Sequence, residues 1–531
     1  MKDNKLIFNK KILLDANKLY DKALKFLIIE LNKTNNQNLN RKQLQVFIGH
    51  WLFSFTKVFL KSYYSKEIIN LKIKKKLVIP KNSYSDYINI VSNNEWHKNF
   101  ISQIRWLKKN NNISIKMIEI YESKNTKSLY KLILYKLHDV FCTLLKTYFL
   151  NKKTFIYNSY LGKLNDILLQ IKFKELPILF FSYPSYSCEI NKTVRLKNLN
   201  KNFNKENKLT KIYLKTLLIN IPVNFLEGFN IVNNYLEKSF LPKKLKFIFN
   251  SNEIITDDYF KIWITKQKSH CKLILSQHGL NYQITNNHFP QMSTIEFSYL
   301  DKILFWGKRM KKKKKYINMF MIPKRKFFVK NKKNLILVLN QSFPNTHYFD
   351  SEKYFLKSFE INNFINGLND EIKKTLLIRL HKINFEPLTT KKIIKLINSN
   401  KNKKTIKIDD GKKNIAKLIQ NSKLLIFTYP SSGFLEAISQ NIPSILLWKN
   451  LKNECLNSAL NDFKSLKNKN IVFTDQKKLS KFLNTNWNLI DEWWDNKASK
   501  KVVTNFSLKY CTFEDKQFFK VYSKIKSFIK I

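Results

Sequence analysis

Polar side chains follow a short apolar run in the segment CKLILSQHGLNY (271–282). The run predicts a buried strand, and Gly279 predicts a turn that leaves His278 at the edge of a sheet. A histidine at that place can take a proton from a substrate hydroxyl near neutral pH. Gln277 and Tyr282 would line the same edge. A histidine that only caps a turn is the structural alternative.

A second apolar run, in TLLIRLH (375–381), ends in two basic side chains. Arg379 and His381 stand two residues apart and therefore point to the same side of a strand. An arginine fork matches the oxygens of a diphosphate, so these residues are candidates for binding one. The alternative for Arg379 is a structural ion pair.

The segment KLLIFTYPSSGFLEAISQNIPSILLW (423–448) joins an apolar run, a turn and a helical pattern. If the helix begins at Gly433, its first N–H groups and its positive dipole end form an anion site beside the Ser431 and Ser432 hydroxyls. Glu436, one turn further, would accept hydrogen bonds from a ribose diol. In the structural alternative, Gly433 is the N-cap and Glu436 closes half of a capping box.

Two other segments hold further candidates. Glu296 and Asp301 bracket a short apolar run in TIEFSYLDKILFWGKRM (294–310), and Asp301 is either a general base or a helix cap. His50 joins an aromatic cluster in IGHWLFSF (48–55), either as core packing or as part of an acceptor pocket. No carboxylate cluster indicates a metal site. These segments also lack the motifs of nicotinamide dehydrogenases, Walker NTPases, zincins and α/β-hydrolases.

The chain is strongly basic, with 97 Lys and Arg against 38 Asp and Glu and a formal net charge of +59. The lysines are dispersed among abundant Asn, Ile, Phe and Tyr, which is the usage that an A+T-rich genome imposes. We therefore expect no specific nucleic-acid partner, although a basic nucleic-acid-binding protein stays open as an alternative of another class. A charge of this size does attract phosphorylated substrates and anionic lipid head groups at low salt.

The cysteines and the apolar runs predict the compartment. The five cysteines are far apart and show no CxxC or zinc-like spacing, which is typical of reduced thiols in a cytoplasmic protein. The N-terminus is too polar for a signal peptide, and unbroken apolar runs reach only about five residues, too few to span a bilayer. We expect a cytoplasmic protein with peripheral contact to the anionic inner face of the cytoplasmic membrane.

The hydrophobic pattern predicts four regions. Residues 1–170 are mainly helical, and residues 171–330 hold strand–helix–strand units that end in a basic connector, 308–333. In residues 331–475 short apolar runs alternate with helical patterns, as in a doubly wound parallel sheet. Residues 476–531 return to helix. The strand-like runs are 244–250, 271–276, 334–340, 375–381, 405–409, 423–429, 443–448 and 470–473.

Two α/β units separated by a connector indicate two lobes that face one cleft. Ligands in such sheets bind beyond the carboxyl ends of the strands. The residues that follow each predicted strand are therefore the candidates for function, and these are the segments described above.

The sequence resembles a family of bacterial transferases in an ordered set of motifs: HWL (50–52), QHG (277–279), E….LD…FWG (296–307), RLH (379–381) and YPSSGFLEA…IPSILLW (429–448). That family is associated with gene clusters for O-antigen and other surface carbohydrates. More distantly, the layout is similar to GT-B glycosyltransferases and to wall-polymer glycerophosphotransferases.

The resemblance implies a GT-B-like α/β fold, in which two Rossmann-like domains face a cleft and the C-terminal one holds the donor nucleotide. By position, the YPSSGFLEA motif would bind the donor phosphate and ribose, the RLH motif would line the diphosphate, and the QHG motif would lie near the reacting centre. Leu280 and Gln283 stand where family members carry glycine, and Lys308 stands where they carry tryptophan.

We therefore expect a metal-independent glycosyltransferase that moves a sugar from a nucleotide-activated donor to a carbohydrate or lipid-linked acceptor. The setting would be O-antigen, lipopolysaccharide or other surface-polysaccharide biosynthesis, with the nucleotide sugar as substrate and no cofactor. His278 would be the base on the acceptor hydroxyl, and Asp301 is the second candidate. The alternatives are a nucleotide-sugar epimerase or polyol-phosphate transferase on the same fold, and an inactive scaffold of a polysaccharide-assembly complex.

Overall fold

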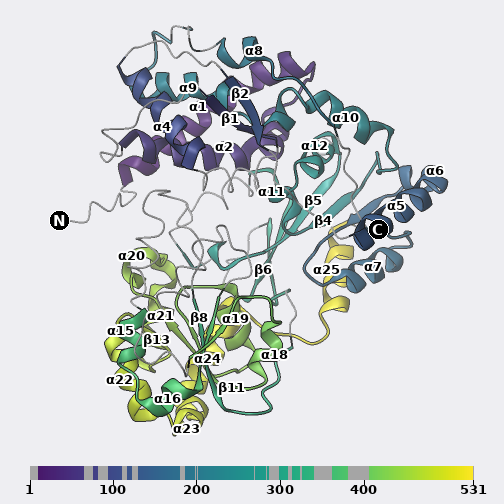
Figure 1. Cartoon of the computed structure of the whole chain (residues 1–531). Coiled ribbons are helices and arrows are strands. Elements are labelled where there is room, and N and C mark those ends of the chain that lie inside the picture. Colours follow the sequence, from purple (N-terminus) through teal and green to yellow (C-terminus); the bar gives the residue numbers. More distant parts are fainter. Residues whose placement is uncertain are drawn as a thin grey trace.

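The computed structural model shows a chain of two lobes, coloured purple to teal and green to yellow in Figure 1. Each lobe is built around its own parallel sheet. The structure describes residues 10–64, 76–81, 94–109, 117–121, 129–179, 186–197, 199, 201, 203–267, 270–282, 284–285, 298–308, 314–322, 326–339, 361–380 and 406–529.

The C-terminal lobe contains a six-stranded parallel sheet with the order β10-β9-β8-β11-β12-β13. Its strands are β8 (Asn334–Val338), β9 (Leu376–Arg379), β10 (Lys407–Asp409), β11 (Ser422–Phe427), β12 (Ser444–Leu447) and β13 (Val472–Phe473). Counted along the chain this order is 3-2-1-4-5-6, that of a Rossmann sheet. The central strands are buried on both faces, which explains their continuous apolar runs. The doubly wound sheet and its six strands are confirmed.

The N-terminal lobe contains a five-stranded parallel sheet with the order β3-β4-β5-β6-β7. Its strands are β3 (Thr154–Ile156), β4 (Phe247–Asn250), β5 (Lys272–Ser276), β6 (Lys302–Trp306) and β7 (Tyr316–Met319). The predicted strands at β4 and β5 are confirmed. The other three strands were missed: β3 lies in the stretch predicted as helical, β7 lies in the predicted basic connector, and β6 was predicted only as a short apolar run.

Helices dominate the start of the chain, as the sequence predicts. The first two, α1 (Lys10–Asn35) and α2 (Arg41–Tyr64), pack against each other, and α2 also packs against α12 (Asp258–Gln267) beside the sheet. One core therefore joins this helical region to the N-terminal lobe. A small parallel pair, β1 (Lys76–Pro80) and β2 (Met117–Tyr121), was not predicted.

The remaining helices of the N-terminal lobe are α4 (Asn94–Lys108), α5 (Leu129–Leu144), α6 (Lys146–Leu150), α7 (Lys163–Lys172), α8 (Lys192–Leu196), α9 (Lys208–Asn220), α10 (Phe229–Lys238) and α11 (Glu253–Thr256), with 3-10 turns η1 (Val223–Phe225) and η2 (Leu280–Tyr282). Those of the C-terminal lobe are α15 (Ile361–Asn366), α16 (Asp370–Thr375), α18 (Ile415–Ile419), α19 (Ser432–Ser439), α20 (Leu451–Glu454), α21 (Asn457–Asn468), α22 (Gln476–Asn486), α23 (Ile490–Asp495) and α24 (Lys497–Tyr510).

The last helix, α25 (Gln517–Ile529), crosses back to the N-terminal lobe and packs against α7 (Figure 1). Val521 and Ile525 of this helix belong to the same core as strands β4 and β5. Among the described residues, no helix combines the length and the apolar character needed to cross a membrane.

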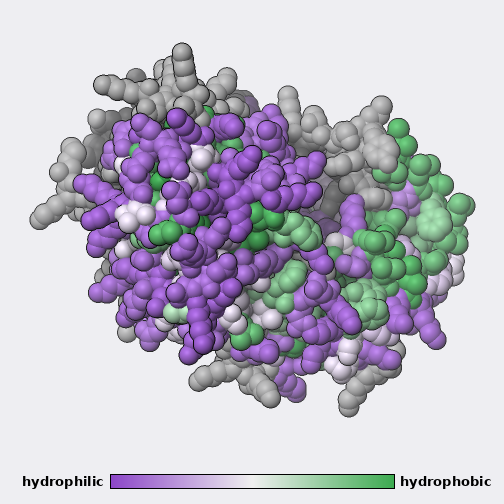
Figure 2. Space-filling view, turned by 90° about the horizontal axis from the view of Figure 1, so that it is seen from below, coloured by the Kyte–Doolittle hydropathy of each residue, from purple (hydrophilic) through white to green (hydrophobic). Residues whose placement is uncertain are grey.

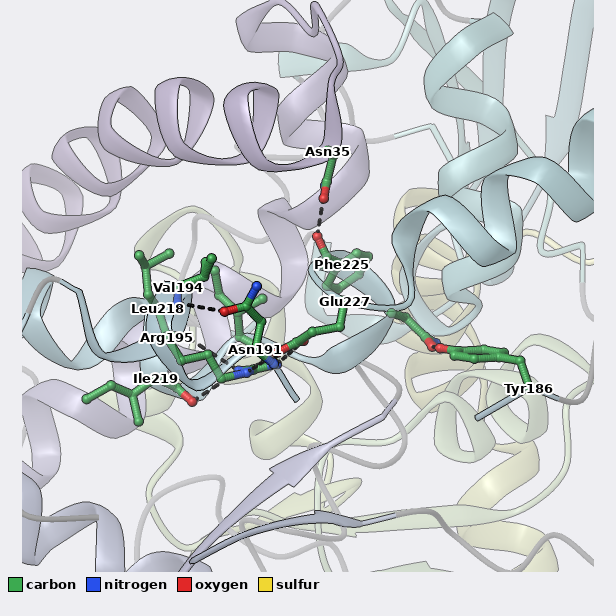
Figure 3. A network of polar contacts seen from close by, with 11 residues as sticks. Asn35, Tyr186, Asn191, Val194, Arg195, Leu218, Ile219, Phe225 and Glu227 are labelled. Carbon is green, nitrogen blue, oxygen red and sulfur yellow. Dashed lines mark hydrogen bonds and ion pairs between the residues drawn. The ribbon is translucent and has the colours of Figure 1, made fainter. Parts of the chain in front are cut away.

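A buried arginine fixes the helices of the N-terminal lobe. Arg195 in α8 is fully buried and donates two hydrogen bonds of 2.6 Å to the carboxylate of Glu227 (Figure 3). Its Nη1 donates to the carbonyls of Leu218, Ile219 and Ile221 at the end of α9, at 3.3, 3.1 and 2.7 Å. The last carbonyls of a helix lack partners within it, so this guanidinium both pairs a carboxylate and caps α9.

Candidate active site

The order of the C-terminal sheet reverses between β8 and β11, and ligands of such sheets bind beyond the strand ends at this point. The two ends are tied together, because the N–H and the hydroxyl of Thr428 both donate to the carbonyl of Val338, at 3.1 and 3.2 Å. The chain then turns through Tyr429 and Pro430 into α19. The first turn of α19 therefore lies at the switch point of the sheet.

Ser431 is the N-cap of α19, and its hydroxyl oxygen accepts a hydrogen bond of 3.2 Å from the N–H of Phe434. The helix thus begins at Ser432, one residue earlier than predicted, and Gly433 is not the N-cap. Ser431 is buried, but Ser432 and Gly433 are partly exposed. The first turn therefore presents N–H groups that have no acceptor inside the helix, which is the arrangement of an anion site.

Close packing explains the glycine of this turn. A Cβ at Gly433 would lie 3.0 Å from the ring of Phe427, the last residue of β11. Glu436 is the fifth residue of α19, so the capping box, which needs the third, is wrong. The Glu436 side chain is only 7% exposed, and its proposed contact with a ribose stays a prediction.

Arg379 ends β9 and lies in the same sheet, but its guanidinium is held by protein groups. It forms an ion pair with the buried carboxylate of Asp409 in β10, and its Nη2 donates to the carbonyl of Gly411 at 3.0 Å. Of the two predicted roles of Arg379, the structure shows the structural ion pair. Its guanidinium is not directed at a diphosphate.

His278 follows β5 at the carboxyl edge of the N-terminal sheet, as predicted. The hydroxyl of Tyr282 lies 3.0 Å from its Nδ1, and the two rings meet edge to face with centroids 5.1 Å apart. His278 keeps part of its surface exposed, but protein atoms surround the ring, and this burial lowers the pKa of the imidazole to about 4. A hydrogen bond to the backbone of Ser251 acts in the opposite direction. His278 is therefore neutral at pH 7.

Gln277 fixes the loop that carries His278. Its Nε2 donates to the carbonyl of Gly279 at 2.7 Å, and its Oε1 accepts from the N–H of Trp306 at 3.0 Å. These bonds join the ends of β5 and β6, so Gln277 positions the loop. A Cβ at Gly279 would meet nothing within 4 Å, which shows that this side of the loop faces open space.

Asp301 lies at the opposite edge of the sheet. Its carboxylate accepts a hydrogen bond of 2.7 Å from the N–H of Leu273, near the start of β5. His278 follows the end of the same strand, and strand geometry separates the two by roughly 15 Å. Asp301 therefore caps the start of the strands, and its assignment as a catalytic base is wrong.

The carboxyl end of β4 carries an acid that is not among the predicted site residues. The carboxylate of Glu253 accepts a hydrogen bond of 2.9 Å from Asn250 and another from Asn158, which follows β3. Burial raises the pKa of Glu253 to about 7, against the lowering effect of these bonds. Burial and then the nearby charge of Glu253 raise the pKa of Tyr160, while a hydrogen bond with Ser251 acts in the opposite direction. Glu253 and His278 follow the carboxyl ends of the paired strands β4 and β5, and Ser251, two residues before Glu253, hydrogen-bonds His278 through its backbone.

A signal for Glu253 was present in the sequence. The segment FNSNE (249–253) follows a predicted strand with polar residues, as QHG does. Its chemistry depends on Asn158, which lies far away in the chain and comes close only because β3 pairs with β4.

The carboxyl edges of the two sheets meet at the contact between the lobes. Thr285, after β5, forms an isolated antiparallel β-bridge with Cys455 of the other lobe. The N–H of Leu456 donates to the carbonyl of Ile284 at 2.9 Å. Leu280, two residues after His278, belongs to the same core as the C-terminal strands. That core includes Phe427 and Phe434, which flank the first turn of α19.

Gly307 makes a second contact between the lobes. It follows β6 with φ of +81°, and a Cβ there would lie 2.4 Å from the backbone oxygen of Lys509 in α24. The N–H of Lys308 donates to the carbonyl of Leu508 at 2.8 Å. Only glycine allows both this backbone conformation and this approach.

His50 of the HWL motif is buried, and its Nε2 lies 2.7 Å from the hydroxyl of Tyr299. Burial, together with the charge of Lys261, holds the pKa of His50 well below its usual range. Trp51 is buried as well and stacks on Phe55. The motif is therefore part of the core beneath the cluster of His278.

Two predicted site residues, His381 and Glu296, lie outside the described residues. Within the described part of the chain, no group of three or more His, Cys, Asp or Glu side chains could hold a metal ion. The cysteines in that part are free thiols.

Two parallel sheets whose carboxyl edges meet, the C-terminal one with the Rossmann order, and a last helix that returns to the first lobe define a GT-B-like fold. The chain belongs to the LIC12162 family of transferases, whose family model matches residues 4–521. The transferase family expected from the ordered motifs is thereby confirmed.

More distant likenesses were also found. The chain is 11% identical to a structure of the wall teichoic acid polymerase TagF. The match covers 76% of this chain and 96% of the TagF chain, with a TM-score of 0.36. It is 8% identical to MurG of Acinetobacter baumannii, over 85% and 99% of the two chains, with a TM-score of 0.34. Protein Ycf2 of Physcomitrium patens is 26% identical over 374 residues, which are 64% of this chain but only 16% of that protein.

Proposed function

We propose that this transferase moves a sugar from a nucleotide-activated donor to a carbohydrate or lipid-linked acceptor, in the assembly of O-antigen or another surface polysaccharide. One observation carries the proposal. A helix N-terminus lies at the switch point of the C-terminal sheet, and the facing sheet edge carries His278 and Glu253.

The first turn of α19 suits a nucleoside diphosphate. The N–H groups of Ser432 and Gly433 and the positive end of the helix dipole would bind its oxygens. The diphosphate gains negative charge as it leaves the sugar, and fixed N–H donors stabilise that charge without having to reorient. Donors of this kind contribute about 10²–10³-fold each to a rate.

Between Glu253 and His278, Glu253 is the better candidate for the general base. A base works best when its pKa lies near the working pH, and the pKa of about 7 for Glu253 meets this condition. The pKa of about 4 makes His278 a weak base, but its neutral ring can hydrogen-bond the acceptor hydroxyl. In the transfer step, Glu253 takes the hydroxyl proton while the acceptor oxygen bonds to the anomeric carbon. The bond from that carbon to the diphosphate oxygen breaks, and its electron pair leaves with the diphosphate.

A thermal-shift panel with UDP, GDP, CMP and CDP tests the donor site. A nucleotide at a hundredfold excess over its Kd stabilises the folded chain by about 2.7 kcal/mol. We expect one nucleoside diphosphate to stabilise the protein, and to stabilise Glu436→Ala less. If none of the four nucleotides stabilises the wild type, the donor site is wrongly assigned.

Product analysis then separates the reactions that this fold could perform. Incubation with the stabilising nucleotide as its sugar conjugate, without an acceptor, should leave the sugar configuration unchanged. An inverted sugar centre would indicate a nucleotide-sugar epimerase, and transfer only from a nucleotide-activated polyol would indicate a polyol-phosphate transferase. Turnover in EDTA tests the expectation that the reaction needs no metal ion.

A further inference from the structure

An apolar helix face lies open on the N-terminal lobe. In α5, Ile133, Leu137, Val140 and Leu144 recur at helical spacing on one side, and all four are exposed, Leu144 by 80%. Such a stripe normally faces a core. Here it faces outward, while the opposite side of α5 buries His138.

The next long helix repeats the arrangement. In α7, Leu164, Leu168 and Ile171 share one exposed side, with Leu164 exposed by 69%. Figure 2 shows hydrophobic side chains gathered over one end of the molecule, where Figure 1 places α5, α6 and α7. A continuous exposed apolar surface of this kind marks an interaction site.

The helices that carry this surface are held together as one unit. The Nε2 of His138 in α5 accepts a hydrogen bond of 3.1 Å from the N–H of Leu179, after α7. The N–H of Leu176 donates to the hydroxyl of Tyr148 in α6 at 3.1 Å. The apolar face is therefore fixed in place and does not depend on a partner for its shape.

The charges around this surface are almost all positive. Among the described side chains between residues 133 and 179, the exposed charged ones are Lys136, Lys146, Lys153, Lys163, Lys172 and Lys174. The carboxylates of the same stretch are turned inward or partly covered: Asp166 is buried, the side chain of Glu175 is 9% exposed beside Lys152, and that of Asp139 is 35% exposed beside His138. By helical spacing, Lys136 and Lys172 stand at the borders of the two apolar stripes.

We propose that the face formed by α5, α6 and α7 docks on a lipid bilayer that contains anionic head groups. Its aliphatic side chains enter the interface, and the lysines contact the head groups, as in other amphipathic membrane-binding helices. A second copy of the chain is a poor occupant, because each copy has a net charge of +59 and would bring lysines against lysines. The proposal concerns attachment and does not depend on the transfer reaction.

Vesicle sedimentation with the full chain tests the proposal. We expect binding to phosphatidylcholine vesicles that contain phosphatidylglycerol, weaker binding to phosphatidylcholine alone, and loss of binding at high salt. The variant Leu137→Glu/Leu144→Glu/Leu164→Glu should bind more than about tenfold more weakly. Each substitution of Lys136 or Lys172 by glutamine should weaken binding by about fivefold.

A matched control places the same three glutamates on exposed apolar positions elsewhere. Ile29→Glu/Ile231→Glu/Leu489→Glu changes the net charge equally, and we expect it to keep most of the binding. Equal binding of both triple variants would overturn the proposal, as would an absence of vesicle binding by the wild type. A dimer in light scattering that only the first variant dissociates would overturn it in favour of a second copy. Because the readout is binding, failure here leaves the proposed reaction untouched.

Discussion

The carboxyl edges of the two sheets present different kinds of groups. The N-terminal edge carries side chains whose pKa values are shifted by burial, Glu253 upward and His278 downward. The C-terminal edge presents the first turn of α19, whose donors are backbone N–H groups and hydroxyls that keep their protons at every working pH. The first edge is therefore suited to proton transfer and the second to binding an anion. In one transfer step, the N-terminal lobe would therefore handle the proton and the C-terminal lobe would bind the leaving diphosphate.

Glu253→Gln should have the largest effect on the rate. The amide keeps the shape of the carboxylate but cannot take a proton, and its single oxygen can accept only one of the two hydrogen bonds that Asn250 and Asn158 donate. General-base catalysis contributes about 10²–10⁴-fold, so kcat should fall by that factor. Nucleotide binding, which belongs to the other edge, should not change. Glu237→Gln on the exposed side of α10 is the control. Equal decreases of kcat in the two variants would show that Glu253 is not the general base.

Arg379→Gln should act on stability. The substitution leaves the buried carboxylate of Asp409 without its ion-pair partner, which costs about 3–5 kcal/mol of unfolding free energy. Chemical denaturation measures this loss, and the double variant Arg379→Gln/Asp409→Asn should recover much of it. If the Arg379→Gln variant is as stable as the wild type but no longer binds nucleotide, Arg379 would have to be assigned to the donor site instead.

The pH dependence of the rate should follow the ionisation of Glu253 at the edge of the N-terminal sheet. With a pKa of about 7, the ionised fraction of Glu253 rises about tenfold between pH 6 and pH 8, and kcat/KM should rise with it. The Kd of the nucleoside diphosphate should change little over the same range. A flat rate profile would show that Glu253 is not the base.

The same group affects stability with the opposite sign. The folded-state pKa of about 7 lies above the ordinary value of 4.5, so the folded chain binds this proton more tightly than the unfolded chain. The resulting stabilisation is complete below about pH 4.5 and is lost as the pH rises through about 7. Urea denaturation at pH 5 and pH 8 should show this loss in the wild type and a smaller one in Glu253→Gln.

Ser431→Ala should have the smallest effect. It removes the N-cap of α19, which costs about 1 kcal/mol of stability and loosens the first turn. Nucleotide binding should weaken slightly, while the pH profile should keep its shape. Ser439→Ala at the other end of the helix is the control, and an effect on the pH profile in Ser431→Ala alone would contradict the division between the edges.

The sequence predicted the C-terminal sheet well because its central strands are buried on both faces. A central strand such as β11 then appears as an unbroken apolar run, and runs of this kind alternate with helices. The strands β3 and β7 were missed because they have 3 and 4 residues and lie at the sheet edges, where too few residues are present to show a period.

The candidate site was predicted in part. His278 and the start of α19 follow from a rule about strand ends, and the structure places both where the lobes meet. Asp301 could have been excluded by the same rule, because a residue that precedes a parallel strand lies at the amino edge. The pairing of Arg379 with Asp409 and the pKa of Glu253 depend on contacts between distant residues, which one sequence does not give.

The affinity of the first turn of α19 for a nucleoside diphosphate tests the central claim most directly. Ser432→Pro removes one N–H from that turn, and proline is well tolerated at the first helical position, after the extended backbone of Ser431. Ser432→Ala keeps the N–H and removes only the hydroxyl. Calorimetric titration of the stabilising nucleoside diphosphate should show a Kd at least about tenfold higher for Ser432→Pro than for Ser432→Ala, because a hydrogen bond to a charged group contributes about 1.5–3 kcal/mol. A folded Ser432→Pro variant with the wild-type Kd would contradict the account.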